Sequence, residues 1–138
     1  MSAAPFVDTN ILVYASTSDR RSEAANAIIS QPFVISVQAL NEFSAVARRK
    51  LRMEWSAIRL ALEYFRTAAV RIVPVDVALH ISALGLAERY NVAFYDSLML
   101  AAALEAESNV FLTEDMHDGL TVEGRMKIVN PFTSRLDA

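Results

Sequence analysis

The feature that most constrains this chain is the alternation of short apolar runs with longer segments of helical periodicity. Runs of strand length occur at residues 5–8, 33–35, 70–75, 110–112 and 127–129. Strands that alternate with helices of about 10 to 15 residues are typical of a parallel sheet. We therefore predict an α/β fold with a central parallel sheet of about five strands, flanked by helices on both faces.

Helical periodicity is expected over residues 11–14, 22–30, 36–50, 55–69, 77–90 and 96–107. Ser36 and Asp76 stand at two of the helix starts, and both are good N-cap residues because their side-chain oxygens can accept hydrogen bonds from free backbone N–H groups. Asp96 is expected to open the last helix. That helix is apolar on nearly every side, so we expect it to lie in the middle of the fold.

The composition indicates one compact domain over residues 1–138. Hydrophobic residues make up 54% of the chain and charged residues 21%, whereas a disordered tail or a long linker would need the opposite balance. The longest apolar stretch, residues 98–104, is far shorter than the roughly 20 residues that a membrane span needs. Asp8 and Asn10 interrupt the apolar N-terminal run and no basic residue precedes it, so we expect no signal peptide and a soluble, cytoplasmic protein.

Cysteine content and net charge exclude further classes of protein. The chain has no cysteine, which excludes disulfides and thiolate metal sites. Its net charge is −3 at pH 7, whereas proteins that hold nucleic acid by bulk charge are usually basic. A nuclease can still be acidic overall if its acids gather around a cation. The positions of the acids therefore matter more than their number.

Acidic residues recur where the expected strands end, and ligands of open α/β sheets bind outside the carboxyl ends of the strands. Asp8 ends the first strand, Asp115 follows the fourth, and Asp118 comes one short loop later. Asp96 lies at the start of the apolar helix. Glu42 lies at the edge of the apolar face of helix 36–50.

Each of these acids also has an ordinary structural explanation. Asp96 can be a simple N-cap, and Asp8 can end its strand by bonding the following turn. Asp115 and Asp118 can be loop acids, and Glu42 can be a helix surface residue. These explanations treat the positions as independent, and they do not account for repeated acids at one edge of one sheet.

Carboxylates that converge need a cation or a proton. Two unit charges about 4 Å apart repel by about 4 kcal/mol at an effective dielectric near 20. Oxygen ligands without His or Cys select hard ions such as Mg²⁺ or Mn²⁺, which support phosphoryl chemistry. Thr9, Ser97 and Thr113 each stand beside an acid and could orient a water molecule or a phosphate oxygen.

The acidic segments resemble the ordered motifs of PIN domains. The matching segments are Asp8-Thr9-Asn10, Asn41-Glu42-Phe43, Tyr95-Asp96-Ser97 and Leu112-Thr113-Glu114-Asp115. Residues 114–119 and 128–132 resemble VapC-type toxins of toxin–antitoxin systems in particular. The resemblance spans nearly the whole chain, and four motifs in the right order and spacing are specific.

The resemblance implies a toxin that is an endoribonuclease for single-stranded RNA. It implies Mg²⁺ or Mn²⁺ held by Asp8, Glu42, Asp96 and Asp115. Asp118 is a further candidate ligand and stands apart from these four, because this position is acidic in only some members of the family. It also implies a homodimer. The expected partner is an antitoxin whose Phe- and Leu-rich segment carries a basic residue that reaches the acids.

Two other classes of protein are alternatives to a PIN-domain nuclease. A haloacid-dehalogenase-like phosphatase would have a second Asp two residues after Asp8, where this chain has Asn10, and a well-placed lysine, for which only Lys50 and Lys127 are available. A non-enzymatic, Mg²⁺-binding receiver-like module would have paired acids after the first strand, and that pair is absent.

A dense basic cluster lies at the end of helix 36–50. Its members are Arg48, Arg49, Lys50 and Arg52. Cations suit the C-terminal end of a helix, so the cluster can be a solvated helix end. It can also contact the phosphate backbone and lead RNA toward the acids.

Overall fold

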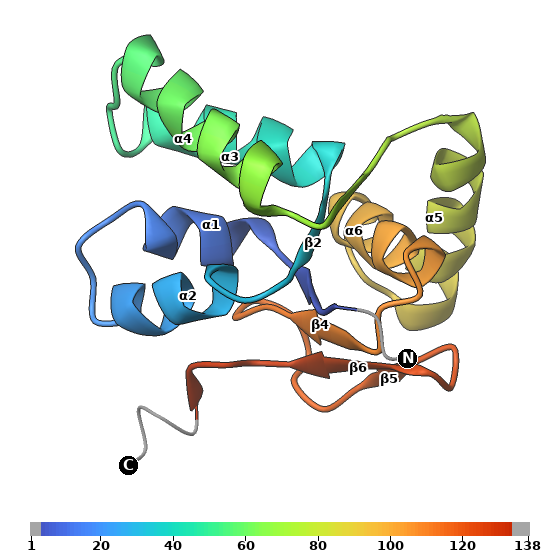
Figure 1. Ribbon diagram of the computed structural model, residues 1–138. Helices are drawn as coiled ribbons and strands as arrows, with labels where there is room; N and C mark the ends of the chain where they lie inside the picture. Colours follow the sequence, from blue (N-terminus) through green and yellow to red (C-terminus); the bar gives the residue numbers. More distant parts are fainter. Residues whose placement is uncertain (1–3, 134–138) are drawn as a thin grey trace.

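The computed structural model describes residues 4–133, and its strands form one six-stranded sheet (Figure 1). The strand order is β3-β2-β1-β4-β6-β5, and only β5 runs antiparallel to its neighbour. The strands are β1 (Phe6–Val7), β2 (Val34–Ser36), β3 (Arg71–Val73), β4 (Val110–Leu112), β5 (Thr121–Val122) and β6 (Met126–Val129). The predicted α/β fold with a mainly parallel sheet is confirmed.

Six helices cover the sheet, with α1 to α4 on one side and α5 and α6 on the other (Figure 1). They are α1 (Thr9–Ala15), α2 (Ser22–Ile29), α3 (Val37–Arg49), α4 (Trp55–Ala68), α5 (Val77–Tyr90) and α6 (Phe94–Glu105). Two expected N-caps are confirmed, because Ser36 Oγ accepts from the N–H of Ala39 (3.2 Å) and Asp76 Oδ1 accepts from that of Leu79 (2.9 Å). In residues 4–133 we find no helix whose length and apolar content would let it cross a bilayer.

The start of α6 corrects one expectation. The helix begins at Phe94 with Ala93 as its N-cap, so Asp96 lies inside the first turn and does not cap the helix. The eight residues from Ser97 to Leu104 are all buried, as the apolar sequence predicts. The carboxylate of Asp96 therefore stands at the exposed end of a helix whose remainder is in the core.

Strand β5 was not expected, and it brings the number of strands from the predicted five to six. β5 and β6 form a hairpin around a turn in which Glu123 and Gly124 both have positive φ values, 52° and 69°. The N–H of Arg125 donates to the carbonyl of Val122 (3.1 Å) and closes this turn. The hairpin extends the sheet at the edge next to β6 and leaves the order of the parallel strands as expected.

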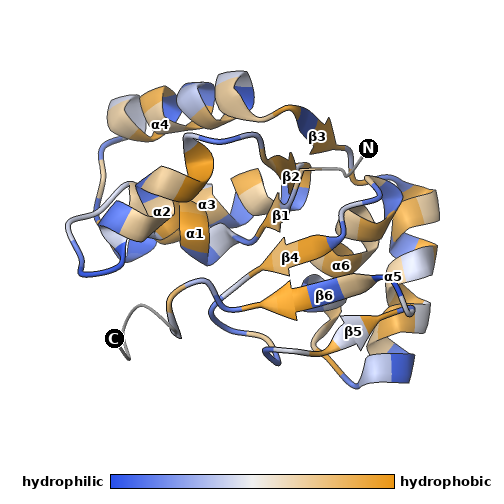
Figure 2. Cartoon of the chain, turned by 60° about the horizontal axis from the view of Figure 1, so that its bottom comes forward, coloured by the Kyte–Doolittle hydropathy of each residue, from blue (hydrophilic) through white to orange (hydrophobic). Residues whose placement is uncertain are grey.

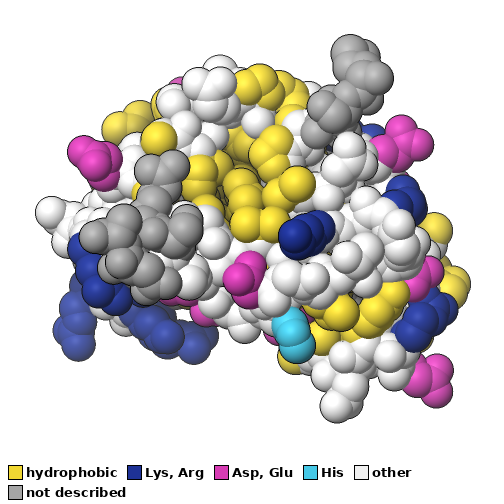
Figure 3. Space-filling model, turned by 90° about the horizontal axis from the view of Figure 1, so that it is seen from below, with side chains coloured by type: hydrophobic (Ala, Val, Ile, Leu, Met, Phe, Trp, Pro, Cys, Tyr) yellow, Lys and Arg dark blue, Asp and Glu magenta, His cyan; other side chains and the backbone are white. Residues whose placement is uncertain are grey.

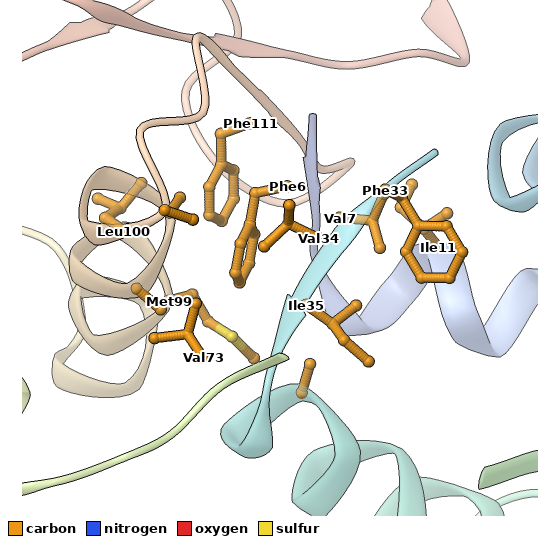
Figure 4. Close-up of a cluster of buried hydrophobic side chains, with 14 of the residues drawn as sticks. Phe6, Val7, Ile11, Phe33, Val34, Ile35, Val73, Met99, Leu100 and Phe111 are labelled. Atoms are coloured by element: carbon orange, nitrogen blue, oxygen red, sulfur yellow. The ribbon is translucent and has the colours of Figure 1, made fainter. Parts of the chain in front are cut away.

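Apolar side chains of the central strands hold the layers together. Figure 2 shows that hydrophobic residues predominate in β4 and β6. Phe6 and Phe111 are register partners on neighbouring strands, and their rings stack with centroids 5.1 Å apart (Figure 4). Met99 and Leu100 of α6 belong to the same buried cluster. This core fixes the strands whose carboxyl ends carry the acids.

Candidate active site

The carboxyl ends of β1 and β4 place two of the acids at one edge of the sheet. Val7 pairs with Leu112, and the N–H of Asp8 donates to the carbonyl of Leu112 (3.0 Å). Both chain segments leave the sheet directly after this pair. Asp8 becomes the N-cap of α1 through a hydrogen bond from the Thr9 N–H to Oδ1 (2.7 Å), and Asp115 lies in the loop after β4.

Two polar side chains connect these acids. Thr113 Oγ1 donates to Asp8 Oδ2 (2.8 Å) and accepts from the N–H of Asp115 (3.1 Å). Asn10 Nδ2 donates to Asp115 Oδ2 (3.1 Å), and Asn10 Oδ1 accepts from the N–H of Glu114 (3.3 Å). Asn10 thus joins the start of α1 to the loop after β4, a role that its place in the sequence did not reveal.

Glu42 reaches the same edge from α3. Its Oε1 accepts from Thr9 Oγ1 (3.0 Å), and its Oε2 accepts from Gln38 Nε2 (3.1 Å). Both carboxylate oxygens are therefore held in a fixed direction. Gln38 was not among the expected site residues, although its position four residues before Glu42 puts both on one side of the helix.

Asp96 approaches from the start of α6 and is half-buried. Burial raises the pKa of its carboxyl, and the negative charges of Glu42 and Asp115 raise it further. Asp96 therefore lies near enough to Glu42 and to Asp115 for the negative charges of both to act on its carboxyl. Burial and repulsion together therefore oppose the ionised form of Asp96.

Asp8 is the most deeply buried of the acids, with 5% of the residue exposed. Desolvation raises its pKa to about 7, against hydrogen bonds from Thr113 and Thr9 that lower it and charges on Asp96 and Glu42 that add to the rise. Desolvation dominates because the ionised carboxylate loses its water while it keeps only two short hydrogen bonds. Burial therefore favours the protonated form of Asp8 up to a higher pH than for an ordinary aspartate.

The four carboxylates come from four different elements and surround one edge of the sheet. They are Asp8, Glu42, Asp96 and Asp115. Within residues 4–133, no three acidic or histidine side chains are already drawn together closely enough to hold a metal ion. The side chains are thus neighbours that repel, and a shared cation would relieve that repulsion.

Three other residues considered from the sequence, Asp118, Ser97 and His117, form no hydrogen bond with the carboxylates of the four acids in the described part of the chain. Asp118 is exposed, and its Oδ1 accepts from the N–H of Asn130 (2.8 Å), which ties the loop after β4 to the end of β6. Ser97 donates to the carbonyl of Phe94 (2.6 Å), so its hydroxyl is turned to its own helix. His117 is exposed on the loop. The structure does not place Asp118 or Ser97 among the contacts that link the four acids.

An ion-pair network lies beside Asp115. Arg21 Nη1 donates to both oxygens of Glu114 (3.0 and 2.8 Å), and its Nε donates to Asp19 (2.9 Å). The guanidinium of Arg21 lies over the ring of Tyr14, 4.2 Å from its centroid. The hydroxyl of Tyr14 donates to Glu114, and burial together with this contact raises the tyrosine pKa to about 12. The network fixes the ring of Tyr14 and the segment that precedes Asp115.

A cleft of about 330 Å³ opens beside the acids. Glu42, Asp115, Thr9 and Asn10 line one part of it. The rest of the lining comes from the C-terminal part of α1 and from the end of α3, at Val13, Tyr14, Val46, Lys50 and Leu51. Glu42 and Asp115 are therefore accessible from a cleft that can hold part of a ligand.

The surface charge is mixed. On the face shown in Figure 3, Lys and Arg side chains form one group at the left and lie scattered in the centre and at the right, with hydrophobic patches and a few Asp and Glu side chains between them. The net charge of −3 agrees with this mixture. Binding of a polyanion on such a protein depends on a few local contacts rather than on a broad basic surface.

The sequence matches the PIN domain over residues 6–117, which is most of the chain. This protein therefore belongs to the PIN domain family. The match includes all four acids that gather at the sheet edge and ends one residue before Asp118. No curated protein sequence matches the chain.

Several solved structures with the same fold come from toxin–antitoxin systems. A toxin–antitoxin complex from Klebsiella pneumoniae is 22% identical with a TM-score of 0.69, covering 93% of this chain and 98% of that one. The sarcin–ricin loop cleaving toxin VapC20 from Mycobacterium tuberculosis is 20% identical with a TM-score of 0.70, covering 88% and 99%. VapBC2 from Rickettsia felis, bound to a DNA fragment from its promoter, is 16% identical with a TM-score of 0.63, covering 92% and 99%. At these identities the likeness concerns the fold.

Proposed function

We propose that this chain is a metal-dependent endoribonuclease and the toxin of a toxin–antitoxin pair. The observation that carries the proposal is the gathering of four carboxylates at the carboxyl edge of the sheet, where desolvation and mutual repulsion raise the pKa values of Asp8 and Asp96. Acids kept together at such a cost are typical of functional sites. Membership of the PIN family and the toxin–antitoxin origin of the similar structures support the same function.

The donor atoms suit Mg²⁺ or Mn²⁺, because they are carboxylate oxygens without sulfur or imidazole nitrogen. Asp8, Glu42, Asp96 and Asp115 would hold the ion, which when bound supplies Lewis-acid activation of water and neutralisation of charge on the phosphate. The chain's own contribution is orientation. Thr113 directs the Asp8 carboxylate, and Thr9 together with Gln38 fixes both oxygens of Glu42.

We exclude Asp118 from the proposed ligands. Its carboxylate already accepts a backbone hydrogen bond from Asn130, and within residues 4–133 it takes no part in the hydrogen bonds that connect the other acids. A supporting role for this residue is therefore the better account.

The proposal includes partners and location. The substrate is single-stranded RNA, and the protein partner is a cognate antitoxin. A homodimer and an antitoxin contact would both use exposed apolar side chains, of which α4 carries Trp55, Leu60 and Tyr64 and α5 carries Ile81 and Leu84. We propose that the chain acts in the cytoplasm as a single domain.

The test is brief expression in bacteria without an antitoxin, followed by sequencing of RNA ends. We expect growth arrest and new RNA ends at discrete sites. Asp96→Asn is the cleaner inactive variant, because no hydrogen bond contributes to the pKa of Asp96 and the change removes only charge. Asp8→Asn keeps the bond from Thr9 but puts a donor opposite the Thr113 hydroxyl, so its fold must be checked by circular dichroism. A folded Asp96→Asn protein as toxic as the parent would contradict the proposal.

A further inference from the structure

The cleft beside the acids continues away from them along an apolar wall. Val13 of α1 and Val46 of α3 line this part, together with Leu51, which follows the helix. Tyr14 adds an aromatic ring that Arg21 and Glu114 hold in place. Apolar lining next to a charged centre indicates a place for a flat or hydrophobic group of the ligand.

Among residues 4–133, Lys50 is the one basic residue in the lining of this cleft. It caps the C-terminal end of α3, where its N–H donates to the carbonyl of Val46 (2.8 Å). Its neighbour in the basic cluster, Arg48, is engaged elsewhere: Nη1 donates to the carbonyl of Met53 (3.1 Å), and the guanidinium lies 5.3 Å from the ring centroid of Trp55. The cluster is therefore divided, and Lys50 is the member that faces the cleft.

We propose that this part of the cleft is a nucleotide subsite, in which Lys50 binds a phosphate and the apolar wall of Val13, Val46 and Leu51 packs against an unpaired base. The proposal rests on the proposed ribonuclease function, because the acids take the reacting phosphate and the subsite takes a neighbouring nucleotide. Glu42, Val46 and Lys50 follow one another at four-residue intervals on one side of α3 and its C-cap, and this order along the cleft supports the occupant. A negative cluster that needs a cation, an apolar wall and then one ammonium group match a phosphate, a base and a second phosphate.

The subsite also requires a single strand. A base can pack against the wall only when it is unpaired, and packing of a base against a protein ring or apolar surface tolerates different sequences. Tyr14 is neutral at physiological pH because its pKa is about 12, so its ring remains an uncharged wall of the cleft. A volume of about 330 Å³ suits one nucleotide unit better than a duplex.

The phosphate part is tested by steady-state cleavage of a labelled, unpaired RNA octamer in Mn²⁺ at several salt concentrations. The matched pair of variants is Lys50→Gln and Arg49→Gln, which remove one positive charge from adjacent positions. We expect Lys50→Gln to raise KM several-fold with kcat nearly unchanged, and to lower the slope of log(1/KM) against log salt by about 0.7. Arg49→Gln should leave both near the parent values. Equal behaviour of the two variants would overturn the role of Lys50.

The base part is tested with octamers that carry one abasic residue at successive positions. For the parent we expect one position, next to the cleaved bond, at which loss of the base raises KM several-fold. Leu51→Ala should raise KM on the intact octamer and should abolish most of that abasic effect, since the wall is already shortened. An abasic profile that is unchanged in Leu51→Ala would overturn the base contact.

The same experiments separate the subsite from the function on which it rests. If the folded parent cleaves none of the octamers, the proposed ribonuclease function fails and the subsite fails with it. If the parent cleaves and Asp96→Asn does not, the function stands. The Lys50 and Leu51 variants then decide the subsite alone.

Discussion

Strands β1 and β4 are apolar in the middle, and a polar residue follows at the carboxyl end of each within two positions. This difference in polarity separates the region that stabilises the fold from the region that carries the candidate site. In the middle, the fully buried rings of Phe6 and Phe111 stack on each other. At the end, Asp8 and Thr113 are also buried, but they are polar. Removal from water lowers the free energy of the rings and raises that of the ionised carboxylate. The same two strands therefore carry residues whose burial stabilises the fold next to a carboxylate whose burial, when ionised, destabilises it.

The contrast shows where the chain departs from the best choice for stability alone. A buried carboxylate keeps its place only where hydrogen bonds compensate for lost water, and Thr9 and Thr113 provide them to Asp8. Departures of this kind are expected at functional sites. The apolar middle of the strands provides the stability that tolerates the polar end.

The largest effect is expected in the apolar region. Phe111→Ala removes one ring of the stacked pair and leaves a cavity, so the free energy of unfolding should fall by about 3–5 kcal/mol. Val70→Ala is the control, because that residue is 60% exposed and the loss of its side-chain atoms should change stability by less than about 0.5 kcal/mol. Urea denaturation measures both. Similar losses for the two variants would contradict the assignment of the core.

The next effect concerns the polar end and its pH dependence. The pKa of Asp8 is about 7 in the folded protein, against the ordinary value of 3.8 expected in the unfolded chain. Between these values the folded protein holds a proton that the unfolded chain has released, so the free energy of unfolding falls as pH rises from about 4 to about 7. The loss from Asp8 is on the order of a few kcal/mol, and the raised pKa of Asp96 acts in the same direction.

Urea denaturation with a chelator present, at a series of pH values, measures this slope. Asp8→Asn cannot ionise, so its stability should depend less on pH across this window than that of the parent. If the free energy of unfolding depended on pH in the same way in the parent and in the variant, Asp8 would have the same pKa in the folded and unfolded states. Such a result would contradict the claim that burial of Asp8 at the polar strand end destabilises its ionised form.

A smaller effect separates Asp118 from the four acids. Asp118→Ala removes the acceptor for the N–H of Asn130 and should lower the free energy of unfolding by about 1 kcal/mol. Asp118→Asn retains an acceptor oxygen and should cost less. Neither change should alter the response to Mn²⁺. A weaker Mn²⁺ response in Asp118→Asn would return Asp118 to the set of ligands.

Much of the fold could be predicted because the sequence pattern is regular. The bounds of β4 and α5 agree with the expected ranges, and the other parallel strands and helices differ by a few residues at their ends. β5 was missed because two residues carry too little periodicity to stand out, and its turn needs positive φ at Glu123, which is uncommon outside glycine. The start of α6 was misplaced because Asp96 has the chemistry of an N-cap, although the helix begins two residues earlier.

The candidate site could be predicted in its acids but not in its connections. Asp8 and Asp115 were expected at strand ends, and parallel pairing of β1 with β4 brings those ends together. Gln38 could have been found from its spacing to Glu42 on one helix. The contact of Asn10 with Asp115 spans 105 positions in sequence, and no local pattern reveals such a contact.

The measurement that tests the account most directly is the melting midpoint of the protein with and without Mn²⁺ at neutral pH. A cation that binds only the folded state stabilises it by about 2.7 kcal/mol at a hundredfold excess over Kd, which corresponds to several degrees. We expect this rise in the parent and in Asp118→Asn. In Asp96→Asn we expect a smaller rise from a metal-free midpoint at least as high as that of the parent, because burial and repulsion no longer act on a charge there. No rise in the parent, or equal rises in the parent and Asp96→Asn, would contradict the claim that these acids share a cation.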